Sequence, residues 1–299
     1  MSHQPDAGKS PGVDPAYAVL LIQSFLAAGT HIVAKVVVRS VDAPTLTLVR
    51  SLIALPVMAG LLLSRGTLKR VERKDYGLIL FLSFLAIPVN QFLYLYGIRF
   101  TIASNAALLY AMTPIVVLVF SRLLLGEALT GRKILGVALG FVGVVVVIFE
   151  RGVSASMDHV YGNLLVFIAV LAWSLYTVYG RRLIARYGSI ESTAMILTGG
   201  TIVFLPFGIL PMAEFPFSTL TGGNWMQILY LALVTSVLSY LLWYYALGRI
   251  EAGKVALFTN LQPILTTGLA VLLLGQDVTV PFVLGGCIAI TGVAIAQYG

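Results

Sequence analysis

The polar residues that lie deepest in the hydrophobic segments of this chain are amides, aromatic side chains and one histidine. Asn90 and Tyr94 stand four positions apart in the segment 76–98, so both project from one helical face. Buried amides need hydrogen-bonding partners, which either a neighbouring helix or a bound solute can supply. Aromatic faces suit amphiphilic or cationic solutes. The residues that we expect to bind a small molecule are His31, Asn90, Tyr94, Tyr110, Trp173, Tyr176, Ser239, Trp243, Asn260 and Gln262.

Three positive charges lie within the hydrophobic segments, and no Asp or Glu lies near any segment centre. Arg122 and Lys35 are close to segment ends, where long side chains can reach the membrane surface. Arg50 lies roughly 9 Å into its segment at 1.5 Å per residue. An ionic side chain at that depth is a candidate functional residue. We expect Lys35 and Arg50 either to receive a carboxylate as charge or gating residues, or to bind helix-end carbonyls.

The residue types that enzymes use are scattered along the chain. His3, His31 and His159 fall in the N-terminal tail, the first hydrophobic segment and a loop, and no His/acid cluster or phosphate-binding glycine loop occurs. The single Cys287 excludes an internal disulfide and a cysteine-based metal site. We therefore expect no catalytic residues, no metal site and no cofactor, and we do not expect an enzyme.

Composition indicates an all-α membrane protein. Hydrophobic residues make up 59% of the 299 residues and charged residues 10%, against about half and a quarter in soluble proteins. The mean hydropathy is +0.97. The net charge of +7 does not indicate nucleic acid, because the basic residues lie mostly between hydrophobic segments. The expected partners are a lipid bilayer and a small molecule, and both a monomer and a homo-oligomer stay open.

Hydrophobic segments fill nearly the whole chain after a polar tail, residues 1–14, which we expect to be disordered and cytoplasmic. This tail lacks the layout of a cleaved signal peptide. A spanning helix needs about 20 largely apolar residues. Ten segments qualify: 17–38, 44–63, 76–98, 104–124, 131–149, 162–184, 192–210, 225–247, 253–274 and 280–298.

Two stretches that start 149 residues apart are versions of one another. Residues 94–147 and 243–296 share 15 identities over 54 positions. Each repeat contains five of the predicted segments, which is an odd number, so the second copy must enter the membrane from the opposite face. Lys and Arg lie mainly on the side of the N-terminus, which predicts that both termini are cytoplasmic. An inverted repeat of membrane helices is typical of secondary transporters, whose site lies between the halves and opens alternately to each side.

The repeated stretches also contain matched prolines and small residues. Pro114 and Pro263 each free a backbone carbonyl within a helix and are expected to bend it. Paired interruptions of this kind point to the site in such repeats, although simple structural kinks are an equally good interpretation. Close helix packing in lipid requires small side chains. The predicted packing faces are Gly136, Gly140 and Gly143 in one copy and Gly285, Ala289 and Gly292 in the other.

The first copy resembles the EamA-type domain of the drug/metabolite transporter superfamily. The resemblance rests on Tyr96, Ala103, Ala107, Pro114 and the run LLLGE that ends at Glu127, followed by a glycine-rich helix. It implies ten transmembrane helices in two inverted five-helix repeats, residues 15–150 and 160–299. It also implies efflux of amino acids, amines or other small metabolites across the bacterial inner membrane. An importer or facilitative exchanger is the first alternative, and a sugar-phosphate or nucleotide-sugar exchanger the second.

Overall fold

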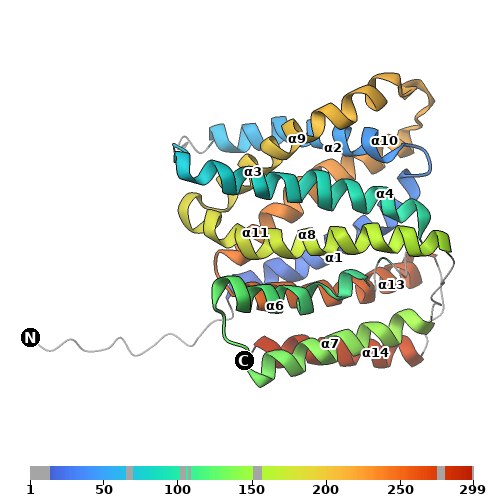
Figure 1. Cartoon of the computed structure of the whole chain (residues 1–299). Coiled ribbons are helices and arrows are strands. Elements are labelled where there is room, and N and C mark those ends of the chain that lie inside the picture. Colours follow the sequence, from blue (N-terminus) through green and yellow to red (C-terminus); the bar gives the residue numbers. More distant parts are fainter. Residues whose placement is uncertain are drawn as a thin grey trace, which may run out of the picture.

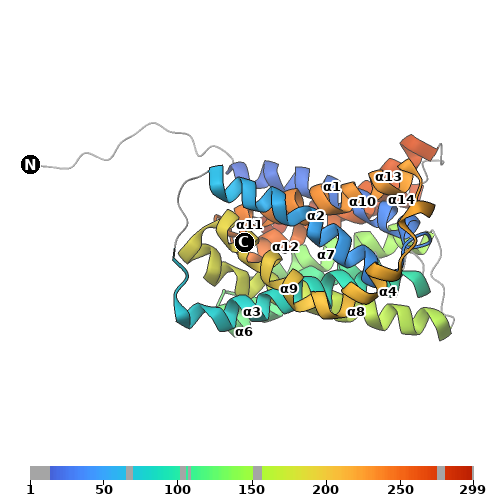
Figure 2. The ribbon, with the colours of Figure 1, turned by 90° about the horizontal axis from the view of Figure 1, so that it is seen from above.

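The computed structural model describes residues 14–64, 70–101, 106, 109–150, 157–274 and 280–297, and these residues form helices and connecting loops without a strand. The helices form a layered bundle (Figure 1; Figure 2 shows the same bundle from above). At one edge lie α7 (Gly131–Glu150) and α14 (Val280–Gln297). At the opposite edge lie α2 (Ala43–Ser64), α9 (Ser189–Glu214) and α10 (Gly222–Leu229). Two predicted features lie outside the described residues: residues 1–13 of the tail, and most of the residues at the start of the fourth segment.

Six helical stretches in the described part of the chain are long and apolar enough to cross a bilayer. They coincide with the first, second, third, sixth, seventh and eighth predicted segments. The uninterrupted helices among them are α1 (Pro15–Val37), α2 (Ala43–Ser64), α8 (Met157–Tyr187) and α9 (Ser189–Glu214).

Four further helices correspond to the remaining predicted segments, and within the described residues they do not meet the same length and hydropathy criteria. Exposed apolar side chains such as Leu123, Phe207 and Ile290 cover the outside of the bundle. These four helices are α6 (Thr113–Leu125), α7 (Gly131–Glu150), α13 (Leu261–Leu274) and α14 (Val280–Gln297).

Local sequence signals account for several helix ends. Asp14 begins α1, because its carboxylate accepts a hydrogen bond from the backbone N–H of Ala16 at 2.8 Å, a favoured cap when Pro occupies the first helical position. Asp42 does the same for α2 through the N–H of Thr45 at 2.9 Å. At the end of α6, Gly126 has φ of 72°, a left-handed conformation that glycine adopts without strain.

Two long helices contain π-helical segments that the sequence analysis did not predict. The first is η2 (Leu85–Gln91), between α3 (Tyr76–Phe84) and α4 (Phe92–Phe100). The second is η4 (Tyr230–Ser239), between α10 (Gly222–Leu229) and α11 (Tyr240–Leu247). Moving η2 along the chain by the repeat offset of 149 gives 234–240, which overlaps η4. The two copies therefore widen at corresponding places, and such widening is frequent at functional sites.

Short irregular segments precede both repeat-related prolines. Pro114 is the second residue of α6, directly after a turn at Met112. Pro263 is the third residue of α13, which follows α12 (Ala252–Ala256) and the 3-10 segment η5 (Leu257–Asn260). Each proline therefore lies in the first turn of a helix that begins after an interruption. The other 3-10 segments are η1 (Arg73–Asp75) and η3 (Phe217–Thr219).

The glycine faces of α7 and α14 pack directly against each other, which confirms the predicted packing role. A β-carbon added to Gly136 would lie 2.5 Å from the carbonyl oxygen of Gly292, and one added to Gly143 would lie 2.5 Å from that of Gly285. No side chain fits at such distances, so the two backbones approach as closely as glycine allows. This helix pair joins the end of the first repeat to the end of the second.

Candidate functional site

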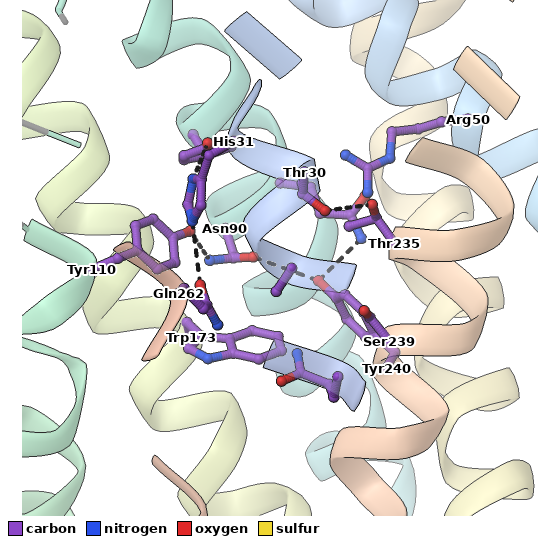
Figure 3. Close-up of a pocket in the computed structure, with 14 residues that line it drawn as sticks. Thr30, His31, Arg50, Asn90, Tyr110, Trp173, Thr235, Ser239, Tyr240 and Gln262 are labelled. Atoms are coloured by element: carbon purple, nitrogen blue, oxygen red, sulfur yellow. Dashed lines mark hydrogen bonds between the residues drawn. The ribbon is translucent and has the colours of Figure 1, made fainter. Parts of the chain in front are cut away.

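A cavity lies inside the bundle and draws its lining from both repeats (Figure 3). Its volume is about 90 Å³. A buried water needs roughly 10–15 Å³ on this scale, so the cavity has room for several waters or a small solute. Its lining consists of Gln23, Ala27, Thr30, His31, Arg50, Asn90, Gln91, Tyr94, Tyr110, Trp173, Thr235, Ser239, Tyr240 and Gln262.

Eight of the residues predicted from the sequence meet in this cavity. They come from α1, α2, η2, α4, α8, η4 and α13, and from the short stretch before α6. The π-helical segments contribute directly, since Asn90 lies in η2 and Ser239 in η4. The eight residues are His31, Arg50, Asn90, Tyr94, Tyr110, Trp173, Ser239 and Gln262.

His31 connects three helices at one side of the cavity (Figure 3). Its Nδ1 lies 2.6 Å from the hydroxyl oxygen of Tyr94, and its Nε2 lies 3.3 Å from Oε1 of Gln262. An amide oxygen only accepts, so Nε2 donates to Gln262, and in a neutral imidazole the Tyr94 hydroxyl donates to Nδ1. The Tyr94 and Tyr110 rings both meet the imidazole edge to face, with centroids 5.6 Å away. The imidazole thereby joins α1 to α4 and α13.

A second polar network crosses from one repeat to the other. Asn90 donates to the Tyr110 hydroxyl at 3.1 Å and to the Ala169 carbonyl at 2.9 Å. Gln91 donates through Nε2 to the Tyr240 hydroxyl at 3.1 Å. Gln91 and Tyr240 are 149 residues apart, which is the offset of the sequence repeat. Equivalent positions of the two copies therefore touch each other at the cavity.

Arg50 is buried and borders the cavity from α2 (Figure 3). Its Nε and Nη2 donate to the same acceptor, the hydroxyl oxygen of Ser236, at 3.1 and 2.8 Å. Ser236 in turn donates to the carbonyl oxygen of Leu231, five residues earlier in η4, at 3.1 Å. Next to this group, the hydroxyl oxygens of Thr30 and Thr235 lie 2.8 Å apart. No carboxylate among the described residues forms an ion pair with Arg50.

Three polar atoms of the cavity lining have no hydrogen-bonding partner in the described part of the chain. They are Oε1 of Gln23, Oε1 of Gln91 and Oγ of Ser239, and all three are buried. Buried polar atoms are normally paired with protein groups or water. These atoms therefore offer hydrogen-bonding capacity to water or to a solute in the cavity.

Two aromatic residues predicted to bind the solute lie behind the cavity wall. Trp243 is fully buried and donates from its indole nitrogen to the hydroxyl of Thr177 at 3.1 Å. Tyr176 stacks on Trp173, with ring centroids 5.2 Å apart. Trp173 lines the cavity, whereas Tyr176 and Trp243 do not. The structure thus places Trp243 and Tyr176 as supports of the cavity wall.

Asn260 and Lys35 also lie away from the cavity lining. Asn260 is fully buried in η5, beside Gly140 of α7, and neither atom of its amide has a partner among the described residues. The Lys35 ammonium donates to the carbonyl oxygens of Ile98 and Thr101, at 2.7 and 2.8 Å. Those carbonyls lie at the end of α4, so Lys35 has the helix-end contacts that were one of its two predicted roles.

Six lining residues were not among the predicted binding residues. For some of them, the spacing along the helix could have predicted a place in the lining. Gln23, Ala27 and Thr30 follow the spacing of one helical face, and this face also approaches His31. Thr235 stands four residues before Ser239. The full set is Gln23, Ala27, Thr30, Gln91, Thr235 and Tyr240.

Ion pairs join the two repeats at the end of the bundle where α7 begins (Figure 1). Glu127, which ends the LLLGE run, pairs with Arg181 of α8 and accepts a hydrogen bond from the backbone N–H of Ala252 at 3.3 Å. Lys133 of α7 pairs with Glu251 at 2.5 Å. The first repeat is thus bound to the second through charged contacts away from the cavity.

Comparisons with known proteins agree with this architecture. The model of the EamA-like transporter family matches residues 14–149 and 160–297. An uncharacterized transporter of Archaeoglobus fulgidus is 28% identical over 281 residues, covering 93% of this chain and 95% of that protein. The uncharacterized transporter YetK of Bacillus subtilis is 27% identical over 271 residues, 89% of this chain and 81% of YetK. A solved structure described only as "Crystal structure of protein" shares the fold, with a TM-score of 0.80, 20% identity and coverage of 95% and 96%.

Proposed function

Because this chain belongs to the EamA-like transporter family, we propose that it exports a small metabolite across the bacterial inner membrane by alternating access. The observation that carries the proposal is the cavity between the repeats, with its hydrogen bond between the equivalent residues Gln91 and Tyr240. Substrate sites of inverted-repeat transporters lie at such an interface near the middle of the membrane. Export, rather than import, follows the resemblance noted in the sequence.

The proposal includes ten transmembrane helices in two inverted repeats, with both termini in the cytoplasm. Six apolar spans and the pairing of α7 with α14 support this arrangement. The start of α1 and the end of α14 lie at one end of the bundle (Figure 1), as they would in a chain with an even number of crossings. The ion pairs of Glu127 and Lys133 lie at this end, so they would close the cytoplasmic side when the cavity opens outward.

Reporter fusions test the topology. Fusions in the loops 65–74, 126–133, 181–190 and 248–254 should report a cytoplasmic position, and fusions near 150–160 and 212–224 an external one. The expectation rests on the excess of Lys and Arg in the first group of loops. A cytoplasmic signal at 150–160 would contradict the inverted five-plus-five arrangement.

A metabolite-tolerance screen tests transport and its direction. Cells that overproduce the protein are compared with vector controls across a panel of amino acids, amines and small organic acids at inhibitory concentrations. An exporter should raise tolerance to its substrate, whereas an importer should increase sensitivity. Purified protein in proteoliposomes should then move the same solute. Equal growth of both strains on every solute, with no flux in proteoliposomes, would contradict the proposed function.

A further inference from the structure

We propose that the cavity selects a small aromatic carboxylate over neutral and cationic solutes, and that Arg50 is the residue that determines this preference. The inference rests on the proposed transport function and specifies the charge of the substrate. It narrows the expectation drawn from the sequence, in which amines and amino acids were equally suitable.

The hydrogen bonds that Arg50 forms within the described part of the chain use only two of its N–H donors. A guanidinium has five N–H donors, and both of these hydrogen bonds go to a single oxygen, that of Ser236. The side chain is only 3% exposed, and a buried charge without a counter-charge is costly. A carboxylate is the group that binds a guanidinium through two parallel hydrogen bonds. A carboxylate-bearing solute would therefore supply the charge that this part of the structure lacks.

The rest of the lining offers nothing that would bind a cation through an ion pair. No Asp or Glu lines the cavity, and Arg50 is its one charged side chain within the described residues. His31 has both ring nitrogens engaged, by Tyr94 and Gln262. A protonated amine would enter a site that contains one positive charge and no negative charge. The charge of Arg50 thus favours anionic over cationic solutes in this cavity.

The unpartnered atoms of the lining add a second requirement. Oε1 of Gln23 and Oε1 of Gln91 have no partner among the described residues, and an amide oxygen can only accept hydrogen bonds. A solute that pairs them must carry an O–H or N–H group in addition to its carboxylate. The walls are aromatic and suit a flat molecular body. They are formed by Tyr94, Tyr110, Trp173 and Tyr240.

A purely structural role for Arg50 makes a different prediction. Ser236 receives Arg50 and donates to Leu231 within η4, so Arg50 could serve only to hold this π-helical segment. In that case replacing Arg50 would lower the stability of the fold and would reduce the binding affinity for all solutes by the same factor. A role in selection instead changes the preference among solutes of different charge.

The experiment measures binding of three matched probes to the purified protein at neutral pH by titration calorimetry. The probes are 4-hydroxybenzoate, 4-hydroxybenzamide and 4-hydroxybenzylamine, which share a ring and a hydroxyl and are anionic, neutral and cationic. The parent should bind the anion at least tenfold more tightly than the amide, and the cation most weakly. Arg50→Gln should reduce affinity for the anion by at least tenfold, about 1.4 kcal/mol, and leave affinity for the amide unchanged. Arg50→Lys should retain the order of the probes.

Arg122→Gln is the matched control, because Arg122 is exposed on α6 and does not line the cavity. It should bind all three probes as the parent does. Thermal unfolding of each variant without solute shows whether the fold is kept. Equal affinity of the parent for the three probes, no binding of any probe, or an equal loss for all probes in Arg50→Gln would overturn the inference. Transport of a neutral or cationic metabolite that Arg50→Gln leaves unchanged would also overturn it, while the proposed transport function would stand.

Discussion

Tyr94→Phe removes one hydroxyl and thereby tests the hydrogen bonds of His31. The Tyr94 hydroxyl lies 2.6 Å from Nδ1 of the imidazole, and both side chains are buried. After the substitution the ring remains, so packing is kept, but Nδ1 has no partner among the described residues. A buried polar atom left without a partner costs about 1–3 kcal/mol. We expect the free energy of unfolding to fall by that amount.

The measurement is equilibrium unfolding of the purified protein in mixed micelles with increasing denaturing detergent. Tyr96→Phe on the same helix is the matched control, since Tyr96 is half-buried and its ring contacts are with Phe92 and Phe100. Its hydroxyl donates to no described residue, so the control should change stability by less than about 0.5 kcal/mol.

A double-mutant cycle then isolates the pair. His31→Leu combined with Tyr94→Phe removes both partners, so the double variant should be more stable than the sum of the single changes predicts, by about 0.5–3 kcal/mol. If Tyr94→Phe and Tyr96→Phe have the same small effect and the cycle shows no coupling, the hydrogen bond does not hold α1 to α4, and the reasoning about this side of the cavity is wrong.

Three further predictions concern residues whose positions differ relative to the cavity. Trp173→Ala should weaken binding of a transported solute about tenfold, whereas Trp243→Ala should mainly lower the free energy of unfolding, by about 3–5 kcal/mol. Binding titrations and unfolding curves of the same preparations separate the two effects. Similar losses of affinity in both variants would contradict the placement of Trp243 behind the cavity wall. Pro114→Ala and Pro263→Ala should slow transport more than they lower protein abundance, which flux assays and immunoblots of the same cells measure. Unchanged flux in both variants would mean that the helix interruptions at these prolines are purely structural. Glu127→Gln should leave solute affinity unchanged in calorimetry, since its contacts lie away from the cavity, and a collapse of affinity would refute that separation.

The repeat and six of the apolar spans could be predicted from the sequence, because they depend on residue type and spacing. Gly136 and Gly143 form a packing face as predicted, because two helix backbones can approach so closely only where the side chain is a single hydrogen. That the partner is α14 was not predicted. The π-helical segments were harder to predict from the sequence. Pro88 within η2 lacks an N–H and marks a break in the helical bonding, but the equivalent position in η4 is Val237, which carries no such signal.

Which buried polar residue faces the cavity depends on how each helix is rotated about its own axis, and the types of the residues do not determine that rotation. Asn260 and Gln262 are two positions apart, which separates their side chains by roughly 200° in a helix of 3.6 residues per turn. Only one of the two can face a given cavity, and the structure gives that place to Gln262 and turns Asn260 toward α7. Similarly, Trp243 and Trp173 are both buried, yet the indole of Trp243 points to the hydroxyl of Thr177 and not into the cavity.

The contact of Gln91 with Tyr240 has a consequence for the energetics of transport. If the two copies had identical sequences, exchanging their conformations would give inward-open and outward-open states of equal free energy. An amide and a phenol at equivalent positions, which hydrogen-bond across the repeat boundary, remove that equality, because each conformation places a different group in each environment. A difference of only 1.4 kcal/mol would populate one orientation ten times more than the other. Under the proposed alternating-access mechanism, the empty protein would therefore favour one of its two orientations, because residues such as Gln91 and Tyr240 differ at equivalent positions of the two copies.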